Sequence, residues 1–234
     1  YKQRLITLMT IFSFMSVGWG QCGDLIEIDS IEDICNLTDL TEINLSYSNL
    51  TGEIPSCIGN LTNLTCLSLS SNELTGEIPP EIGNLTNLGE IYLHYNQLSG
   101  SIPPEIGYLT NLTQLWLPHN QLSGGIPPSI GNLINLNTLF LSYNQLTGEI
   151  PFELVNLTNL LGLTLDNNQL TGEIPEYICD FMNSNLEELE LGYNQLCPPY
   201  PECIEDYVGE QDTSECVEID YCDLNLDGEI NILD

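Results

Sequence analysis

The sequence has almost no basic side chains. Its 234 residues contain 2 Lys plus Arg against 34 Asp plus Glu, which gives a formal net charge of −32 at pH 7. Both basic residues, Lys2 and Arg4, lie at the start, and no Lys or Arg follows them. Proteins bind phosphate groups and anionic lipid headgroups through such cations. We therefore exclude nucleic acid and anionic membrane surfaces as partners.

The sequence also lacks a hydrophobic run long enough to cross a membrane comfortably, which takes about 20 residues. The longest apolar run, Leu5 to Val17, follows a basic start and precedes small residues at Gly18 and Gly20. This order is typical of a secretory signal peptide. We expect residues 1–20 to be cleaved, with an uncleaved signal anchor as the alternative. The protein is then secreted or held at the cell surface.

Catalytic signatures are missing as well. The sequence has no Ser in a nucleophile-elbow context, no Cys–His pair and no Gly-rich phosphate loop. Its Glu residues recur in a repeated LTGEIP pattern rather than as one distinctive pair. We therefore do not expect an enzyme.

What the sequence does contain is one unit repeated at intervals of about 24 residues. LTCLSLSSNELTGEIPPEIGNLTN aligns with the segment that follows it, LGEIYLHYNQLSGSIPPEIGYLTN, and the register continues in both directions. A unit this short cannot close a hydrophobic core alone, so the copies must stack into a solenoid. Seven copies begin at an equivalent Leu: Leu40, Leu64, Leu88, Leu112, Leu136, Leu160 and Leu186.

The pattern LxxLxLxxNxL in each copy is that of a leucine-rich repeat. The LTGEIPxxIGNL that follows resembles the plant-type subclass of receptor-kinase ectodomains and polygalacturonase inhibitors. The resemblance covers residues 40–204 and implies an α/β-type solenoid, a right-handed horseshoe of seven repeats with a concave parallel β-sheet and few helices. We expect an N-terminal cap over residues 21–39 and an acidic linker over residues 205–222.

Within each repeat, alternate strand residues have different roles. Leu67 and Leu69 with their equivalents are expected to point into the core, while the residues between them face outward on the concave side. A repeated Asn is expected to be buried and to bond backbone groups where the coil bends, because an unpaired buried amide is costly. This Asn ladder consists of Asn72, Asn96, Asn120, Asn144, Asn168 and Asn194.

Nine Cys in an exported chain favour disulfides, and the odd count leaves at least one thiol over or a partner lost by truncation. At each end of the solenoid, two Cys occupy the same pair of repeat phases on neighbouring coils. We therefore predict the disulfides Cys35–Cys57 and Cys179–Cys203, against the alternative that each Cys is an apolar filler. Cys197 and Cys216 flank one acidic loop and are candidates for a further bridge. Lipidation of Cys22 is the weaker reading, since the preceding Gln is not the small residue expected there.

Outward positions place aromatic side chains on three neighbouring strands. Such exposed aromatics usually mark a binding surface, although cross-strand packing explains part of the pattern. The two His lie in different phases with no third ligand, so we do not expect them to bind a metal. We predict one exposed ligand-binding surface, the aromatic patch, at the centre of the concave sheet: Tyr92, His94, Tyr95, Trp116, His119, Phe140 and Tyr143.

The final segment, DLNLDGEINILD over residues 223–234, has the spacing of a calcium loop. It resembles the dockerin variant of the EF-hand, cut short here, which implies Ca²⁺ as a cofactor and a cohesin-like partner. Because the chain also begins with Tyr rather than Met, we interpret it as a piece of a longer protein. The predicted calcium ligands are Asp223, Asn225, Asp227, Glu229, Asn231 and Asp234.

Two classes of function remain. The first is a secreted recognition protein that binds a protein, peptide or glycan on the concave face and attaches through the calcium module. The second is a structural or assembly component in which the solenoid acts as a spacer and the aromatic patch packs against another chain.

Overall fold

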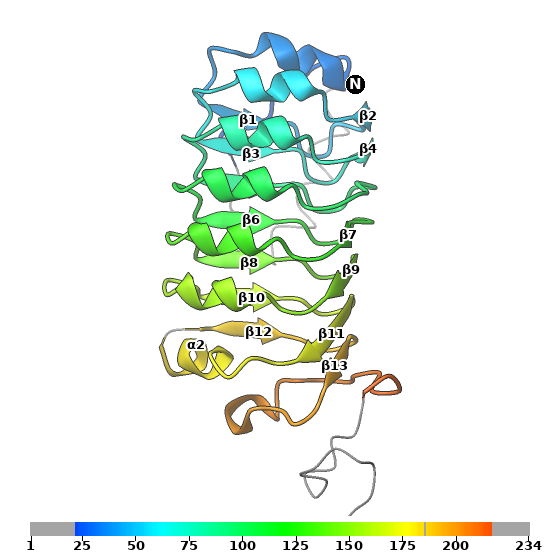
Figure 1. Cartoon of the computed structure of the whole chain (residues 1–234). Coiled ribbons are helices and arrows are strands. Elements are labelled where there is room, and N and C mark those ends of the chain that lie inside the picture. Colours follow the sequence, from blue (N-terminus) through cyan, green and yellow to red (C-terminus); the bar gives the residue numbers. More distant parts are fainter. Residues whose placement is uncertain (1–21, 185, 217–234) are drawn as a thin grey trace, which may run out of the picture.

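The computed structural model describes residues 22–184 and 186–216. Within these residues the chain winds into stacked coils, and each coil contributes one short strand to a continuous sheet (Figure 1). Short helices lie on the opposite side of the stack from this sheet. This arrangement confirms the predicted α/β solenoid with few helices.

The concave sheet is parallel, and neighbouring strands pair residue for residue across the repeats. Leu67 pairs with Ile91, and Ile91 with Leu115, so the predicted buried column forms and these side chains are fully buried. In the described part of the chain its strands are β1 (Glu42–Asn44), β3 (Cys66–Ser68), β5 (Glu90–Tyr92), β6 (Gln114–Trp116), β8 (Thr138–Phe140), β10 (Gly162–Thr164) and β12 (Glu188–Glu190).

A second set of short parallel strands lies along another side of the coils, on the right of Figure 1. Each follows the bend of its coil, and β4, β9, β11 and β13 carry one buried Leu among exposed or half-exposed residues. These strands are β2 (Thr51–Glu53), β4 (Glu73–Thr75), β7 (Ser123–Gly124), β9 (Gln145–Gly148), β11 (Gln169–Glu173) and β13 (Gln195–Cys197).

The helices are mostly single 3₁₀ turns that begin just after the repeated Ile-Pro. Pro fits the first helical position because its missing N–H has no partner there. The Gly of each IGN must stay small, since a Cβ at Gly83 would lie 2.7 Å from the backbone oxygen of Glu105 on the next coil. The helices are η1 (Ile31–Asn36), η2 (Ser56–Asn60), η3 (Pro80–Asn84), η4 (Pro104–Tyr108), η5 (Pro128–Asn132), η6 (Phe152–Asn156), α2 (Ile178–Ser184) and η7 (Glu202–Ile204).

The Asn ladder bonds the backbone as predicted, and its residues are buried except Asn72, at the N-terminal end, which is half-buried. Asn120 Nδ2 donates to the carbonyl oxygens of Leu93 and Leu117, at 3.0 and 3.1 Å. Its Oδ1 accepts from the Leu98 N–H at 3.0 Å. The other ladder residues repeat this pattern, so each amide ties two successive coils together.

The residue just before each ladder position adopts a left-handed backbone conformation. Its φ lies between 54° and 56° in every repeat. Residues with a Cβ pay about 1–3 kcal/mol for such a conformation, so it persists only where the surroundings enforce it. Here the ladder amide holds the bend, and the side chain is left on the rim of the concave face. The rim positions are Tyr47, Ser71, Tyr95, His119, Tyr143, Asn167 and Tyr193.

Both ends of the solenoid are closed by caps with disulfides. Cys35 is joined to Cys57 and Cys179 to Cys203, the two pairs that the repeat phases predict. Cys197–Cys216 is also formed. In the last coil α2 stands where the other coils have a 3₁₀ turn, next to the two-residue insertion before Leu186.

Residues 205–216 are not the linker that the acidic composition suggested. Gln211 Oε1 accepts from the Leu196 N–H at 3.1 Å and its Nε2 donates to the Leu191 oxygen at 2.9 Å. It thus bonds the last coil as a ladder Asn would, and Val208 is buried beside it. This segment closes the core because the last coil otherwise exposes its Leu side chains and backbone groups. Residues 217–222 lie outside the described part.

No helix among the described residues is both long and apolar enough to cross a membrane. The leader prediction, residues 1–20, lies outside them.

Candidate functional site

The strand register brings the seven residues of the aromatic patch together on the concave sheet. Tyr92 pairs with Trp116, and Trp116 with Phe140, on β5, β6 and β8. The patch therefore exists as one cluster of rings. Its exposure, however, differs from the prediction.

Tyr92 and Trp116 are buried, at 1% and 7% exposure, rather than exposed. The Trp116 ring centroid lies 5.6 Å from that of Tyr92 and 4.7 Å from that of Phe140, which is half-buried. These rings lie over neighbouring strands and cover one another. Phe140 leans over Gly162, where an added Cβ would lie only 2.7 Å from the ring. The three rings form an aromatic floor, and they contribute to stability as well as to the surface.

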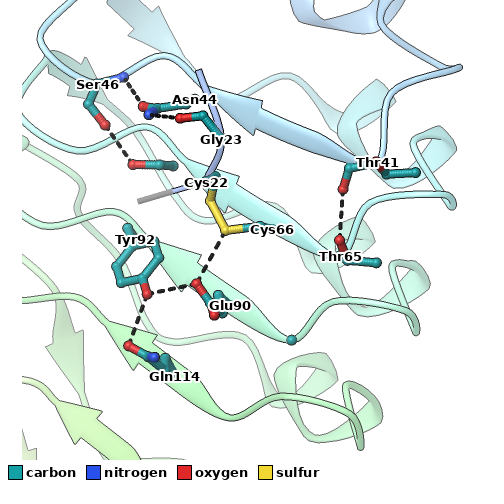
Figure 2. The surroundings of a disulfide bond; sticks show 12 residues. Cys22, Gly23, Thr41, Asn44, Ser46, Thr65, Cys66, Glu90, Tyr92 and Gln114 are labelled. Carbon is teal, nitrogen blue, oxygen red and sulfur yellow. Dashed lines mark hydrogen bonds between the residues drawn. A yellow bond between two sulfur atoms is a disulfide. The ribbon is translucent and has the colours of Figure 1, made fainter. Parts of the chain in front are cut away.

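The polar atoms of this floor are bonded within the sheet. The Tyr92 hydroxyl lies 2.9 Å from both Glu90 Oε2 and Gln114 Oε1 (Figure 2). Burial, followed by the hydrogen bond with Glu90 and its charge, raises the pKa of Tyr92 above its usual value. Trp116 Nε1 donates to Thr138 Oγ1 at 2.9 Å. These bonds fix the orientation of both rings.

His94 is the third buried member of the patch, at 8% exposure. Its ring lies 5.8 Å from Trp116 and 5.7 Å from Tyr95, so it connects the floor to the rim. Burial, with a smaller contribution from the charge of His119, lowers the pKa of His94 to about 4. His94 is therefore neutral at physiological pH.

The exposed part of the patch is a stack of three rings on the rim. His119 lies between Tyr95 and Tyr143, with ring centroids 4.3 Å apart on both sides and interplanar angles of 9° and 13°. Each Tyr is 49% exposed. Partial burial lowers the pKa of His119, and the charge of Asp166 opposes this shift. We call Tyr95, His119 and Tyr143 the rim stack; it is the part of the patch that a ligand can reach directly.

Carboxylates follow the patch on the next two strands. Asp166 lies after β10, and Glu188 and Glu190 lie on β12. Burial, then the charges of Glu190 and Asp166, raise the pKa of Glu188. These three side chains therefore repel one another, and the concave face becomes more acidic toward the C-terminal coils.

A further disulfide, Cys22–Cys66, lies on the concave side at the N-terminal edge of the floor (Figure 2). Cys66 packs in the same cluster as Tyr92 and Trp116. Neither Cys had a predicted disulfide partner. Cys66 occupies the first, outward-facing position of β3, so the repeat phase places it on the concave face, where the N-terminal cap brings Cys22. The bridge also uses the Cys22 thiol that lipidation would need.

The described residues contain no group of three or more His, Cys, Asp or Glu side chains that could hold a metal ion. The predicted calcium ligands, Asp223 to Asp234, lie outside the described residues, so the calcium loop stays a prediction.

Comparison with known families identifies the repeats. The family described as Leucine Rich Repeat matches residues 39–61, 111–133, 135–157 and 159–181, and Leucine Rich repeats (2 copies) matches residues 62–105. Together these matches cover more than half of the chain. No curated protein matches the sequence.

Several solved structures are similar. A TDR receptor is 39% identical over 75% of this chain and 30% of its own, with a TM-score of 0.68. The ectodomain of the Arabidopsis receptor kinase HAESA, in complex with an IDA peptide hormone ligand, is 38% identical over 76% and 29%, with a TM-score of 0.70. A plant ice-binding protein is 29% identical over 75% and 62%, with a TM-score of 0.55.

The chain thus spans about three tenths of the length of the two receptors. Because a peptide-hormone receptor and an ice-binding protein share this fold, the fold alone does not decide what the chain binds.

Proposed function

Because the chain belongs to the leucine-rich repeat family, a non-enzymatic binding fold, we propose that it is an extracellular recognition module that binds an extended peptide or protein segment on its concave face. The observation that carries this proposal is the rim stack, in which two exposed Tyr rings flank a half-buried His ring beside a rigid aromatic floor. The concave face is the usual binding face of a solenoid.

The geometry of the patch suits a peptide. Strands about 4.8 Å apart spread three neighbouring rings over roughly 10 Å, enough for two peptide side chains. Tyr and His lose little conformational entropy on binding, and here their rings are already ordered by stacking. The HAESA ectodomain, with a TM-score of 0.70, is in complex with a peptide hormone. This likeness supports a peptide or protein partner, with a glycan as the alternative ligand.

The compartment follows from the disulfides and the ectodomain neighbours. Four disulfides join described Cys residues, and disulfides persist in oxidising surroundings. Together with the likeness to receptor ectodomains, they indicate an extracellular protein. We propose that the protein is either secreted or displayed at the cell surface.

We also propose that residues 223–234 bind Ca²⁺ and attach the protein to a cohesin-like partner. The support is the loop spacing alone: Asp, Asn and Asp at alternate positions, then Gly at the sharp turn. Isothermal calorimetry of the chain with CaCl₂, beside an Asp223→Ala, Asp227→Ala variant, tests it; equal heats for both proteins would contradict it.

The binding face is tested by replacing rim Tyr residues with a residue that also tolerates the left-handed backbone conformation of these positions. Asn tolerates the left-handed conformation, and Asn167 already occupies this phase on the next coil. We expect Tyr95→Asn with Tyr143→Asn to weaken binding to a peptide array by at least about tenfold, because aromatic anchors dominate interface energetics. Tyr47→Asn and Tyr193→Asn are matched controls: exposed Tyr residues in the same phase, outside the patch.

Unchanged array binding in the Tyr95→Asn, Tyr143→Asn variant would contradict a binding role for the rim stack. Self-association of the wild type that depends on concentration and disappears in the same variant would instead favour the assembly component.

A further inference from the structure

The concave face carries carboxylates but no cation of its own. The sequence has no Lys or Arg after position 4, so the described strands and bends of this face contain neither. Both His on the face have lowered pKa values and are mainly neutral at pH 7. The carboxylates that the strands and the following bends place on this side are Glu42, Glu90, Asp166, Glu188 and Glu190.

The densest group adjoins the exposed end of the rim stack. Glu188 and Glu190 alternate along β12, and Asp166 is on the preceding coil. Burial, then the charges of Glu190 and Asp166, raise the pKa of Glu188, and no Lys or Arg among the described residues offsets these charges. A cationic ligand group would relieve this repulsion, whereas an acidic or phosphorylated one would increase it.

The Asp166 carboxylate is held in place for such a contact. Ser142 Oγ donates to its Oδ1, and Asn167 Nδ2 donates to its Oδ2 at 2.7 Å. Both neighbours are uncharged, and each carboxylate oxygen retains a lone pair for a further donor. Two donors from neighbouring coils thus order the group before any ligand arrives.

The Tyr143 ring provides the second half of the contact. It stacks on His119 with one face, and its other face is turned toward the next coil. That coil has Asn167 in the same phase, directly after Asp166. Lys and Arg bind favourably over the face of a Tyr ring, and more so where a carboxylate lies beside it.

We propose that the segment bound on the concave face is a basic peptide, with a Lys or Arg side chain placed between the Tyr143 ring and the Asp166 carboxylate and further positive charge toward Glu188 and Glu190. This inference rests on the proposed function, since it specifies the ligand of the same face. Apolar or aromatic ligand residues then lie over the rim stack, on the coils of the solenoid that precede the Asp166 coil.

The test uses short synthetic peptides that combine Leu and Tyr with Arg, together with twins in which Gln or Glu replaces Arg. We expect the Arg peptides to bind at least about tenfold more tightly than the Gln twins, and the Glu twins not to bind. Affinity for the Arg peptides should fall as NaCl increases, because the contact is electrostatic.

A strongly acidic protein attracts basic peptides non-specifically, so a charge-matched control is needed. Asp166→Asn, Glu188→Gln, Glu190→Gln removes three negative charges from the concave face. Glu81→Gln, Glu105→Gln, Glu153→Gln removes three from the helices η3, η4 and η6 on the opposite side. We expect the concave triple variant alone to lose the preference for Arg over Gln.

The outcomes separate the two claims. Equal effects of both triple variants would overturn the proposed basic subsite. Tight binding of the Gln twins that is lost in Tyr95→Asn, Tyr143→Asn would also overturn it, but would support peptide binding on this face. Failure of every peptide to bind, alongside binding of a neutral glycan, would overturn the peptide assignment itself.

Discussion

Replacing Asn120 by Ala probes the bond pattern that holds the coils together. The substitution removes the side-chain bonds with Leu98, Leu93 and Leu117, together with a longer contact of 3.5 Å to the Pro118 oxygen, from a side chain that is 9% exposed. The Leu98 N–H loses its side-chain acceptor and remains buried, which costs about 1–3 kcal/mol. The carbonyl oxygens of Leu93 and Leu117 each lose one bond.

Those two carbonyls keep one bond each, from Asn96 and Asn144. Each lost bond should therefore cost only the net value of a hydrogen bond, about 1 kcal/mol. We expect Asn120→Ala to lower the free energy of unfolding by about 3–5 kcal/mol in total.

Urea unfolding followed by circular dichroism measures this loss, with Asn132→Ala, an exposed Asn in the next 3₁₀ helix, as the control. The control should change the free energy of unfolding by less than about 0.5 kcal/mol. A loss below about 1 kcal/mol for Asn120→Ala would refute the claim that the ladder carries the stability of the bend.

Three further predictions concern the patch and the charge. The folded state holds the pKa of His94 near 4, below the ordinary 6.5, so stability present above pH 6.5 should be lost as pH falls toward 4, by about 1.4 kcal/mol per pH unit. His94→Gln should flatten this part of the urea-derived stability curve, and parallel curves would contradict the shift. Gly162→Ala should push the Phe140 ring aside, with a loss of about 1–3 kcal/mol and an altered near-ultraviolet circular dichroism signal; an unchanged spectrum and stability would show that the ring is not confined. The net charge of −32 should make the melting temperature rise between low salt and about 1 M NaCl, where screening shortens to about 3 Å, and a flat response would show that self-repulsion is negligible.

The repeat pattern predicts most of the fold because phase alone decides which side chains face the core. The column through Leu67, Ile91 and Leu115 follows from a period of two within a strand and a fixed interval between strands. The Asn ladder follows from the cost of burying an amide. The cap disulfides follow from equivalent phases on neighbouring coils.

Exposure could not be predicted from phase in the same way. Tyr92 faces away from the leucine core, yet Trp116, His94 and the neighbouring bridge at Cys66 bury it. An outward direction gives the face on which a ring lies, while its exposure depends on the size of the neighbours. The left-handed rim, which separates the exposed stack from the buried floor, has no distinct residue type in the sequence: Tyr, Ser, His and Asn all occupy it.

The C-terminal cap was missed for a related reason. Residues 205–216 are acidic and leave the repeat, which indicated a linker. Gln211 nevertheless takes over the backbone bonds of a ladder Asn from outside the repeat register. Its role depends on the path of the chain after Cys203, which composition does not encode.

The central claim, that the aromatic patch is the binding face, is tested most directly by the fluorescence of Trp116. The sequence has two Trp, Trp19 and Trp116, and expression from residue 21 onward leaves only the one in the aromatic floor. An Arg-containing peptide whose binding has been measured by calorimetry should change the Trp116 emission when it is titrated in. The dissociation constant from this fluorescence titration should equal the one from calorimetry. The same titration of Tyr95→Asn, Tyr143→Asn should give no change at these peptide concentrations. Calorimetric binding that leaves Trp116 emission unchanged in the wild type, and persists in that variant, would place the ligand elsewhere on the protein.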